Sequence, residues 1–160
     1  MQKNLTYSRA LRAALFACLL GALSWKALEV EAHNDSAAKN KAIVTEFYNL
    51  IFRDHKPEEA FARFGAAKYV QHNPRVPDGQ DAFIKYFVPY FNTHPDARNE
   101  IKRTLADGNL VVLHVHSKQN ASDRGRAVVD IFRVENGKVV EHWDVIQEIP
   151  EQAANDNGVF

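Results

Sequence analysis

The segment 127–147, AVVDIFRVENGKVVEHWDVIQ, predicts a β-hairpin. Two runs of β-branched and aromatic residues flank an Asn-Gly pair at 136–137, and both turn residues tolerate the positive φ angles that a two-residue hairpin turn requires. Polar side chains interrupt the apolar runs, with Asp130 in the first run and His142 and Asp144 in the second. A carboxylate among apolar strand neighbours is unfavourable unless it is hydrogen-bonded or faces a cavity. The hairpin therefore predicts either a lined pocket or an amphipathic sheet with these groups in water.

The pairing of the two strands decides which of these side chains share a face. With the Asn-Gly pair at the turn centre, a regular hairpin pairs Asp130 with Trp143. One face of the hairpin then carries Asp130, Phe132, Val134 and Trp143, and the other carries Ile131, Val140, His142 and Asp144. Asp130 and Asp144 therefore line one pocket only if a β-bulge shifts the register.

Composition limits the classes of protein to which the chain can belong. It has 160 residues, of which 46% are hydrophobic, which is enough for one domain with a core. Twenty basic residues balance twenty acidic ones, and neither a basic patch nor a Gly-rich phosphate loop is present. Nucleic acid is therefore not an expected partner. The single cysteine, Cys18, allows no internal disulfide.

The N-terminus has the pattern of a secretory signal peptide. Three basic residues precede a short apolar run at 13–23, which is too short for a comfortable membrane span. We expect residues 1–32 to be the signal peptide, with cleavage after Ala32 or earlier, after Ser24. A retained anchor and lipidation at Cys18 are the alternatives. The expected location is the periplasm or the exterior, with no stable membrane association after processing.

The remaining chain reads as helices followed by strands. Apolar residues recur at helical spacing from Ser36, from Pro57 and over 80–92, and strand patterns cover 69–72, 98–105, 110–118 and the hairpin. This order predicts one α+β domain over 36–150, with the helices on one face of a mostly antiparallel sheet, and a loose tail over 151–160. The predicted core contains Ile43, Phe47, Phe61, Phe83 and Phe87.

Further histidines are candidates for chemistry. His72 precedes a Pro-fixed turn and is either an acid/base group in a cavity or a turn residue that bonds its own backbone. His114 and His116 share one strand face with Leu110 and Val112, whereas the intervening residues form the other face. The two imidazoles could line a pocket, face solvent, or bind a metal if further ligands were added. By residue type alone, the candidates for those ligands are Asp130, His72 and His142.

Five segments together resemble the SnoaL-like polyketide cyclase family, within the nuclear transport factor two-like superfamily. They are NKAIVTEFYNLIF, YVQHNP, DGQDAFIKYF, LVVLHVHSK and the hairpin, and the resemblance spans residues 40–150. It implies a cone-shaped α+β roll, in which a curved, mostly antiparallel sheet wraps around three N-terminal helices and leaves a pocket at the open end. It also implies a homodimer formed through the outer sheet face.

The resemblance also implies site residues. In the cyclases, an aspartate in the last strand is the general acid/base of an intramolecular aldol condensation, and Asp144 occupies the matching place. The family position one strand earlier is often histidine, and this chain has Asp130 there instead. The cyclases are cytoplasmic, whereas this chain carries an export pattern. Both departures concern the specific reaction rather than the fold.

We therefore expect a cofactor-free acid/base enzyme that acts on a small carbonyl compound in an apolar pocket. Asp144 would take a proton α to the carbonyl, and His72 or His116 would polarise or protonate the oxygen. The expected catalytic residues are Asp144, Asp130, His72 and His116, and the expected substrate-binding residues are Tyr69, Phe87, Trp143 and His142. No metal or cofactor is expected. The alternatives are a non-catalytic small-molecule-binding protein and a metal-dependent site built on His114 and His116.

The export pattern yields the first testable prediction. Protein purified from its native host should begin near His33 or Trp25, because a leader peptidase removes the basic and apolar segment. N-terminal sequencing measures this directly. An intact Met1 on protein recovered from the cytoplasm would contradict the prediction.

Overall fold

The computed structural model describes the chain from residue 4 to residue 160, with side chains from Trp25 onward. The chain divides into two units, Met1–Asp35 and Ser36–Phe160, and helix α1 (Asn4–Phe52) runs through their boundary. The expected signal peptide includes residues 1–3 and the side chains of 4–24, which lie outside the described residues. Within the described part, no helix has both the length and the apolar character needed to cross a membrane.

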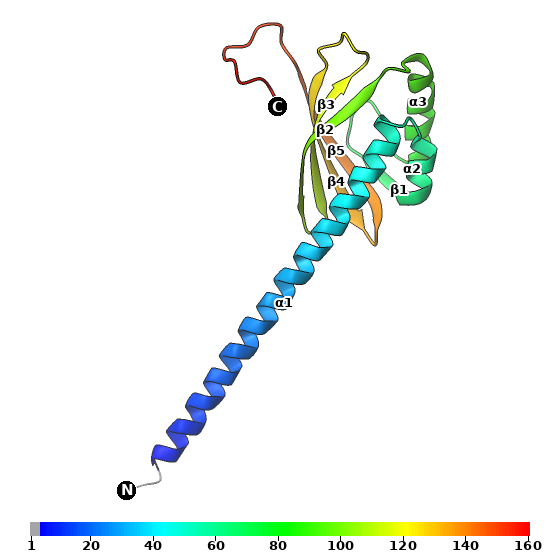
Figure 1. Ribbon diagram of the computed structural model, residues 1–160. Coiled ribbons are helices and arrows are strands. Elements are labelled where there is room, and N and C mark those ends of the chain that lie inside the picture. Colours follow the sequence, from blue (N-terminus) through cyan, green and yellow to red (C-terminus); the bar gives the residue numbers. More distant parts are fainter. Residues whose placement is uncertain (1–3) are drawn as a thin grey trace. The chain divides into compact units, whose positions relative to one another are not determined.

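The second unit is an α+β domain (Figure 1). After α1 come α2 (Pro57–Phe64), β1 (Gly65–Gln71), α3 (Gln80–Thr93), β2 (Arg98–Asp107), β3 (Leu110–Lys118), β4 (Arg126–Glu135) and β5 (Lys138–Glu148). The five strands form one open sheet in the order β1-β5-β4-β3-β2. Strand β1 runs parallel to β5, and every other neighbouring pair is antiparallel. The predicted fold class, with three helices packed on a mostly antiparallel sheet, is confirmed.

Local sequence explains where the elements begin and turn. Pro57 occupies the first turn of α2, where a backbone N–H would have no acceptor within the helix, so proline is tolerated. Two glutamates in the same turn add negative charge, which is favourable at a helix N-terminus. Asn136 and Gly137 have φ angles of 50° and 75°. Positive φ at both central residues is the signature of a type I′ hairpin turn, so the Asn-Gly prediction is confirmed.

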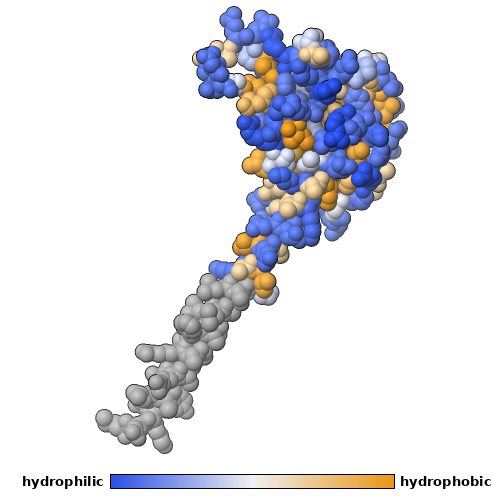
Figure 2. All heavy atoms as spheres, viewed as in Figure 1, coloured by the Kyte–Doolittle hydropathy of each residue, from blue (hydrophilic) through white to orange (hydrophobic). Residues whose placement is uncertain are grey.

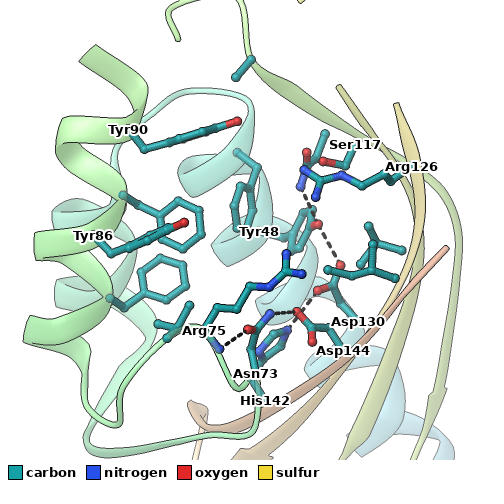
Figure 3. A pocket seen from close by; sticks show the side chains of 18 of the residues that line it. Tyr48, Asn73, Arg75, Tyr86, Tyr90, Ser117, Arg126, Asp130, His142 and Asp144 are labelled. Atoms are coloured by element: carbon teal, nitrogen blue, oxygen red, sulfur yellow. Dashed lines mark hydrogen bonds and ion pairs between the residues drawn. The ribbon is translucent and has the colours of Figure 1, made fainter. Parts of the chain in front are cut away.

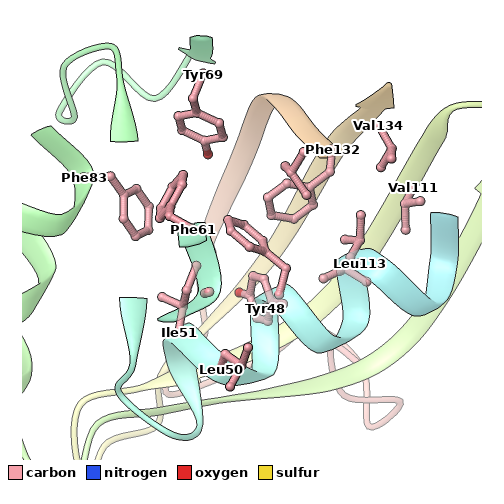
Figure 4. Packing of buried hydrophobic residues seen from close by; sticks show 14 of the residues in the cluster. Tyr48, Leu50, Ile51, Phe61, Tyr69, Phe83, Val111, Leu113, Phe132 and Val134 are labelled. Carbon is pink, nitrogen blue, oxygen red and sulfur yellow. The ribbon is translucent and has the colours of Figure 1, made fainter. Parts of the chain in front are cut away.

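The core lies between the helices and the inner face of the sheet (Figure 4). On β3, Val111, Leu113 and Val115 are fully buried, and the alternating residues face the outer side, as period-two geometry requires. Phe47 of α1 packs edge-to-face on Phe61 of α2, with ring centroids 5.1 Å apart. All five predicted core residues belong to this cluster, Phe47, Phe61 and Phe83 as buried members and Ile43 and Phe87 as partly buried ones.

A bulge in β5 changes the hairpin register. Val134 pairs with Val139, but Arg133 pairs with Glu141, so that Val140 has no partner on β4. Asp130 is consequently opposite Asp144 and not opposite Trp143. The regular hairpin pairing expected from the sequence is therefore wrong. The structure has instead the β-bulge that allows Asp130 and Asp144 to line one pocket. One extra residue reverses the faces of everything beyond it on β5.

The outer surface has a mixed character. In the view of Figure 2, the domain is mostly hydrophilic, and hydrophobic residues form small groups between polar ones. On the outer face of the sheet, Leu105, Leu110 and Val145 are exposed. The ring of Phe160, the last residue, lies 4.7 Å from the His116 ring on the same face. The homodimer expected through this face stays a prediction.

The core predicts a matched pair of stability changes. Leu50→Ala should lower the free energy of unfolding by about 2–5 kcal/mol, because Leu50 is 5% exposed and its loss leaves a cavity. Leu105→Ala should change it by less than about 0.5 kcal/mol, because that side chain is 60% exposed. Urea denaturation followed by circular dichroism measures both. Equal effects of the two truncations would contradict this account of the core.

Candidate functional site

A cavity of about 320 Å³ lies between α3 and the inner face of the sheet (Figure 3). Its size falls at the lower end of the range typical of small-molecule sites. One wall is aromatic and comes from α1 and α3, with the residues Tyr48, Phe52, Phe83, Tyr86, Phe87, Tyr90 and Phe91. The opposite wall is formed by strands β2 to β5 and carries the polar groups.

Three polar side chains converge on the sheet side of this cavity. Asp130 comes from β4, and His142 and Asp144 come from β5. One ligand atom from each residue lies within 4.8 Å of the others. Asp130 and His142 are only 5% and 7% exposed, whereas Asp144 is half-buried. The β5 bulge brings the three together, because it places Asp144 directly opposite Asp130.

The hydrogen bonds around His142 define where protons lie. Gln71 Oε1 accepts the backbone N–H of Asn73 at 2.9 Å and is 2.8 Å from His142 Nδ1, so Nδ1 must donate and carries a proton. His142 Nε2 is 3.0 Å from Asp130 Oδ1. A hydrogen bond between these two atoms requires one further proton, held by the imidazole or by the carboxyl group. Asp130 and His142 therefore form a buried pair that shares one proton.

Tyr48 of α1 completes the surroundings of Asp130. The Tyr48 hydroxyl accepts from Asn99 Nδ2 at 2.8 Å and donates to Asp130 Oδ2 at 2.8 Å. Burial first, and then the nearby charge of Asp130, raise the pKa of Tyr48 well above its usual value. The phenol thus stays protonated and remains a donor near neutral pH. Both oxygens of Asp130 are engaged.

Asp144 is held differently. Asn73 Oδ1 accepts the backbone N–H of Arg75 at 2.9 Å, which fixes the amide orientation, and Asn73 Nδ2 donates to Asp144 Oδ2. Among the described residues, none donates a hydrogen bond to the other oxygen, Oδ1. Asp144 is therefore the member of the cluster with an oxygen available to a bound molecule.

Two of the predicted site residues, His72 and Trp143, lie outside the cavity. His72 follows the end of β1, and Trp143 follows the bulge in β5. The rings of His72 and Trp143 stack at 4.7 Å on the outer side of the sheet. His72 Nε2 is 2.8 Å from Glu141 Oε1, a contact that lowers the pKa of Glu141, with the Arg133 guanidinium adding to the effect. Trp143 faces outward since the shifted register gives the inward positions to its two neighbours. The expectation that His72 and Trp143 line the pocket is wrong.

The paired histidines of β3 also face the outer side. His116 Nε2 donates to the Arg124 carbonyl oxygen at 2.7 Å, and His114 Nδ1 is 2.8 Å from Arg103 Nη1. The prediction that they share one face is confirmed, but the expectation that His116 serves the pocket is wrong. Within the described chain, they also have no third metal ligand, since the group with suitable geometry is Asp130, His142 and Asp144.

Tyr69 is a core residue and does not line the cavity. It is buried, and its ring packs edge-to-face on Phe61 at 5.1 Å. Of the eight predicted site residues, the cavity contains Phe87, Asp130, His142 and Asp144. Sequence reasoning missed the partners that position them, namely Tyr48, Gln71, Asn73 and Asn99. Only Asn73, directly before Pro74, carried a local signal, and that signal indicated a turn.

A metal ion would compete with the proton in this cluster. Asp130, His142 and Asp144 supply three ligand atoms, but Nε2 and Oδ1 already bond to each other and Nδ1 bonds to Gln71. Coordination would require the proton between Nε2 and Oδ1 to leave. The geometry as it stands is that of a hydrogen-bonded acid/base cluster.

The profile of the SnoaL-like domain family matches residues 44–142, which is more than half of the chain. The chain belongs to the SnoaL-like domain family. Sequence comparison with curated proteins gives no match.

Solved structures of low identity share the fold of this SnoaL-like protein. A proposed ketosteroid isomerase from Kribbella flavida is 18% identical, with a TM-score of 0.60, over 75% of this chain and 86% of that one. A nuclear transport factor two-like protein of unknown function from Mesorhizobium loti is 22% identical, with a TM-score of 0.58, over 70% and 93%.

A proposed polyketide cyclase from Acidithiobacillus ferrooxidans is 20% identical, with a TM-score of 0.55, over 68% of this chain and 87% of that one. At these identities the likenesses show a shared α+β fold alone, and they carry no residue roles.

The hydrogen bond from Tyr48 to Asp130 yields a matched stability prediction. Tyr48→Phe should lower the free energy of unfolding by about 1–3 kcal/mol, because it leaves a buried carboxylate oxygen without its donor. Tyr86→Phe should change it by less than about 0.5 kcal/mol, because Tyr86 is 49% exposed. Thermal and urea unfolding measure both variants. A Tyr48→Phe protein as stable as wild type would show that the bond is not needed.

Proposed function

We propose that this SnoaL-like protein is a cofactor-free acid/base enzyme that acts on a small carbonyl compound, by cyclase or isomerase chemistry. The observation that carries the proposal is the cluster of Asp130, His142 and Asp144 beside an aromatic-walled cavity. The cluster combines a carboxylate with one free oxygen and a buried pair that shares one proton. A base and an acid side by side are what enolisation of a carbonyl compound needs.

In the proposed reaction, Asp144 Oδ1 takes a proton from the carbon next to the carbonyl. The C–H electron pair forms a carbon–carbon double bond, and the carbonyl oxygen accepts the proton held between Asp130 and His142. Return of a proton at another carbon gives an isomer, and attack of the enol carbon on a second carbonyl gives an aldol product. Tyr48 and Gln71 keep the acid pair in place by bonding its outer atoms.

The fold neighbours support this class of chemistry. They include a proposed ketosteroid isomerase and a proposed polyketide cyclase, and both names describe reactions of carbonyl compounds. Compared with the sequence-based expectation, the proposed base is unchanged. The proposed acid moves from His72 or His116 to the pair of Asp130 and His142.

The alternative is a small-molecule-binding protein without turnover. The same cavity supports it, because aromatic walls bind apolar ligands whether or not a reaction follows. For either activity we propose export to the periplasm or the exterior, supported by the basic and apolar N-terminal pattern.

The proposal predicts that Asp144 is required for proton abstraction. In D2O, the purified protein should catalyse deuterium exchange at the carbon next to the carbonyl of 2-tetralone or phenylpyruvate. Proton NMR measures the rate of this exchange. Asp144→Asn keeps the shape of the side chain but removes the base, so exchange should fall by on the order of a hundred- to ten-thousand-fold. Binding of the same compounds, measured by calorimetry, should persist.

Asp81→Asn, at the exposed start of α3, is the matched control and should leave exchange unchanged. A chelator should also leave the rate unchanged, since the proposed steps use only protein side chains. Binding of the probes without exchange by wild-type protein would favour the binding protein over the enzyme. Exchange that survives Asp144→Asn would remove Asp144 from the mechanism.

A further inference from the structure

We propose that the substrate of this cavity is an anion: a carbonyl compound with a carboxylate group that Arg75 and Arg126 bind. This inference rests on the proposed function for the carbonyl group and adds the charge of the substrate. It starts from the charges that line the cavity. Four basic residues, Arg75, Arg98, Lys118 and Arg126, line it together with only two carboxylates, Asp130 and Asp144. The whole chain, by contrast, has a net charge of zero.

Two of the four basic side chains point into the cavity from different elements (Figure 3). Arg75 belongs to the loop between β1 and α3, and its backbone N–H is held by Asn73. Arg126 is the first residue of β4 and comes from the sheet. A ligand between α3 and the sheet therefore lies within reach of guanidinium groups on both sides.

The charge of these two arginines remains available to a ligand, although that of Arg126 also helps to lower the pKa of Asp123. Among the described residues, neither Arg75 nor Arg126 makes an ion pair, although other arginines do, as Arg133 with Glu141 and Arg124 with Glu151 show. Asp144 already accepts its hydrogen bond from Asn73. A guanidinium presents several N–H donors in a planar fork that matches a carboxylate, so two unpaired arginines at one cavity fit an anionic group.

The arrangement also orients such a substrate. Its carboxylate is repelled by Asp144 and attracted by the arginines, so the carbonyl end is directed to the acid/base cluster. The aromatic residues of α3, Tyr86, Phe87 and Tyr90, provide an apolar surface for the body of the molecule. The class that fits all three regions is a keto acid with an apolar or aromatic body.

Paired probes of matched shape, one anionic and one neutral, test this proposal without any need for turnover. We would titrate the full-length protein with 2-naphthylacetate and with 2-naphthylacetamide by calorimetry. The acetate should bind at least about tenfold more tightly than the amide, as expected for a charge-assisted hydrogen-bonded pair. This preference should shrink when the salt concentration is raised, because the cavity mouth is open to screening ions.

Variants assign the preference to the arginines. Arg75→Gln combined with Arg126→Gln should make the two probes bind equally. Each single change should reduce the preference for the acetate, and the single variants provide the test if the double variant does not fold. Arg126→Lys should retain part of it, because the charge remains but the planar fork is lost. Arg103→Gln removes the same charge on the outer face of the sheet, next to His114, and should leave the preference intact.

The outcomes separate this proposal from the proposed function. Equal binding of acetate and amide, or binding of neither, overturns the anionic substrate even if deuterium exchange is observed. A preference that persists in the double arginine variant also overturns it. A preference that is lost with the arginines supports it even if no exchange occurs, because binding of the probes does not depend on the base. In Asp144→Asn the acetate should bind no more weakly than in wild type, since a repelling charge is removed.

Discussion

The single unpaired residue in β5 determines which side chains reach the cavity. Val140 has no partner on β4, and every residue beyond it on β5 faces the side opposite to that of a regular hairpin. His142 and Asp144 thereby join Asp130 on the inner face, and Trp143 is directed outward. Without this bulge, Asp130 would lie inside the cone while its partners lay outside. The acid/base cluster thus depends on a backbone irregularity and not only on the identity of its members.

The cluster is stable in the interior because each buried polar atom has a partner. Asn99, Tyr48, Asp130, His142 and Gln71 form one continuous series of hydrogen bonds from β2 through α1 to the end of β1. A buried carboxylate without these donors would be strongly unfavourable, and a partly satisfied network would be worse than an apolar core. The same bonds that stabilise the fold therefore hold the proton-sharing pair in a fixed geometry.

Much of the fold could be predicted from the sequence, because strand alternation, helical spacing and the Asn-Gly turn are local patterns. The alternation of side chains along a strand likewise predicted that His114 and His116 share one face of the sheet. The bulge could not be predicted, since Val140 and Val139 are chemically alike and the register is decided by packing across the sheet. The position of His72 against Trp143, and the use of Tyr48 as a donor to Asp130, also depend on contacts between residues far apart in the chain.

Asn73 contacts both halves of the site. Its amide donates to Asp144 and accepts from the backbone of Arg75, so one side chain sets the distance between the proposed base and the loop that carries the proposed anion anchor. The proposed base lies on strand β5 of the sheet, whereas the proposed anchor lies on a short loop that ends at α3. A change in the length or sequence of that loop would move the anchor relative to the base without altering the base itself. Relatives that keep the hairpin but vary this loop would therefore present the same proposed base to molecules of different length.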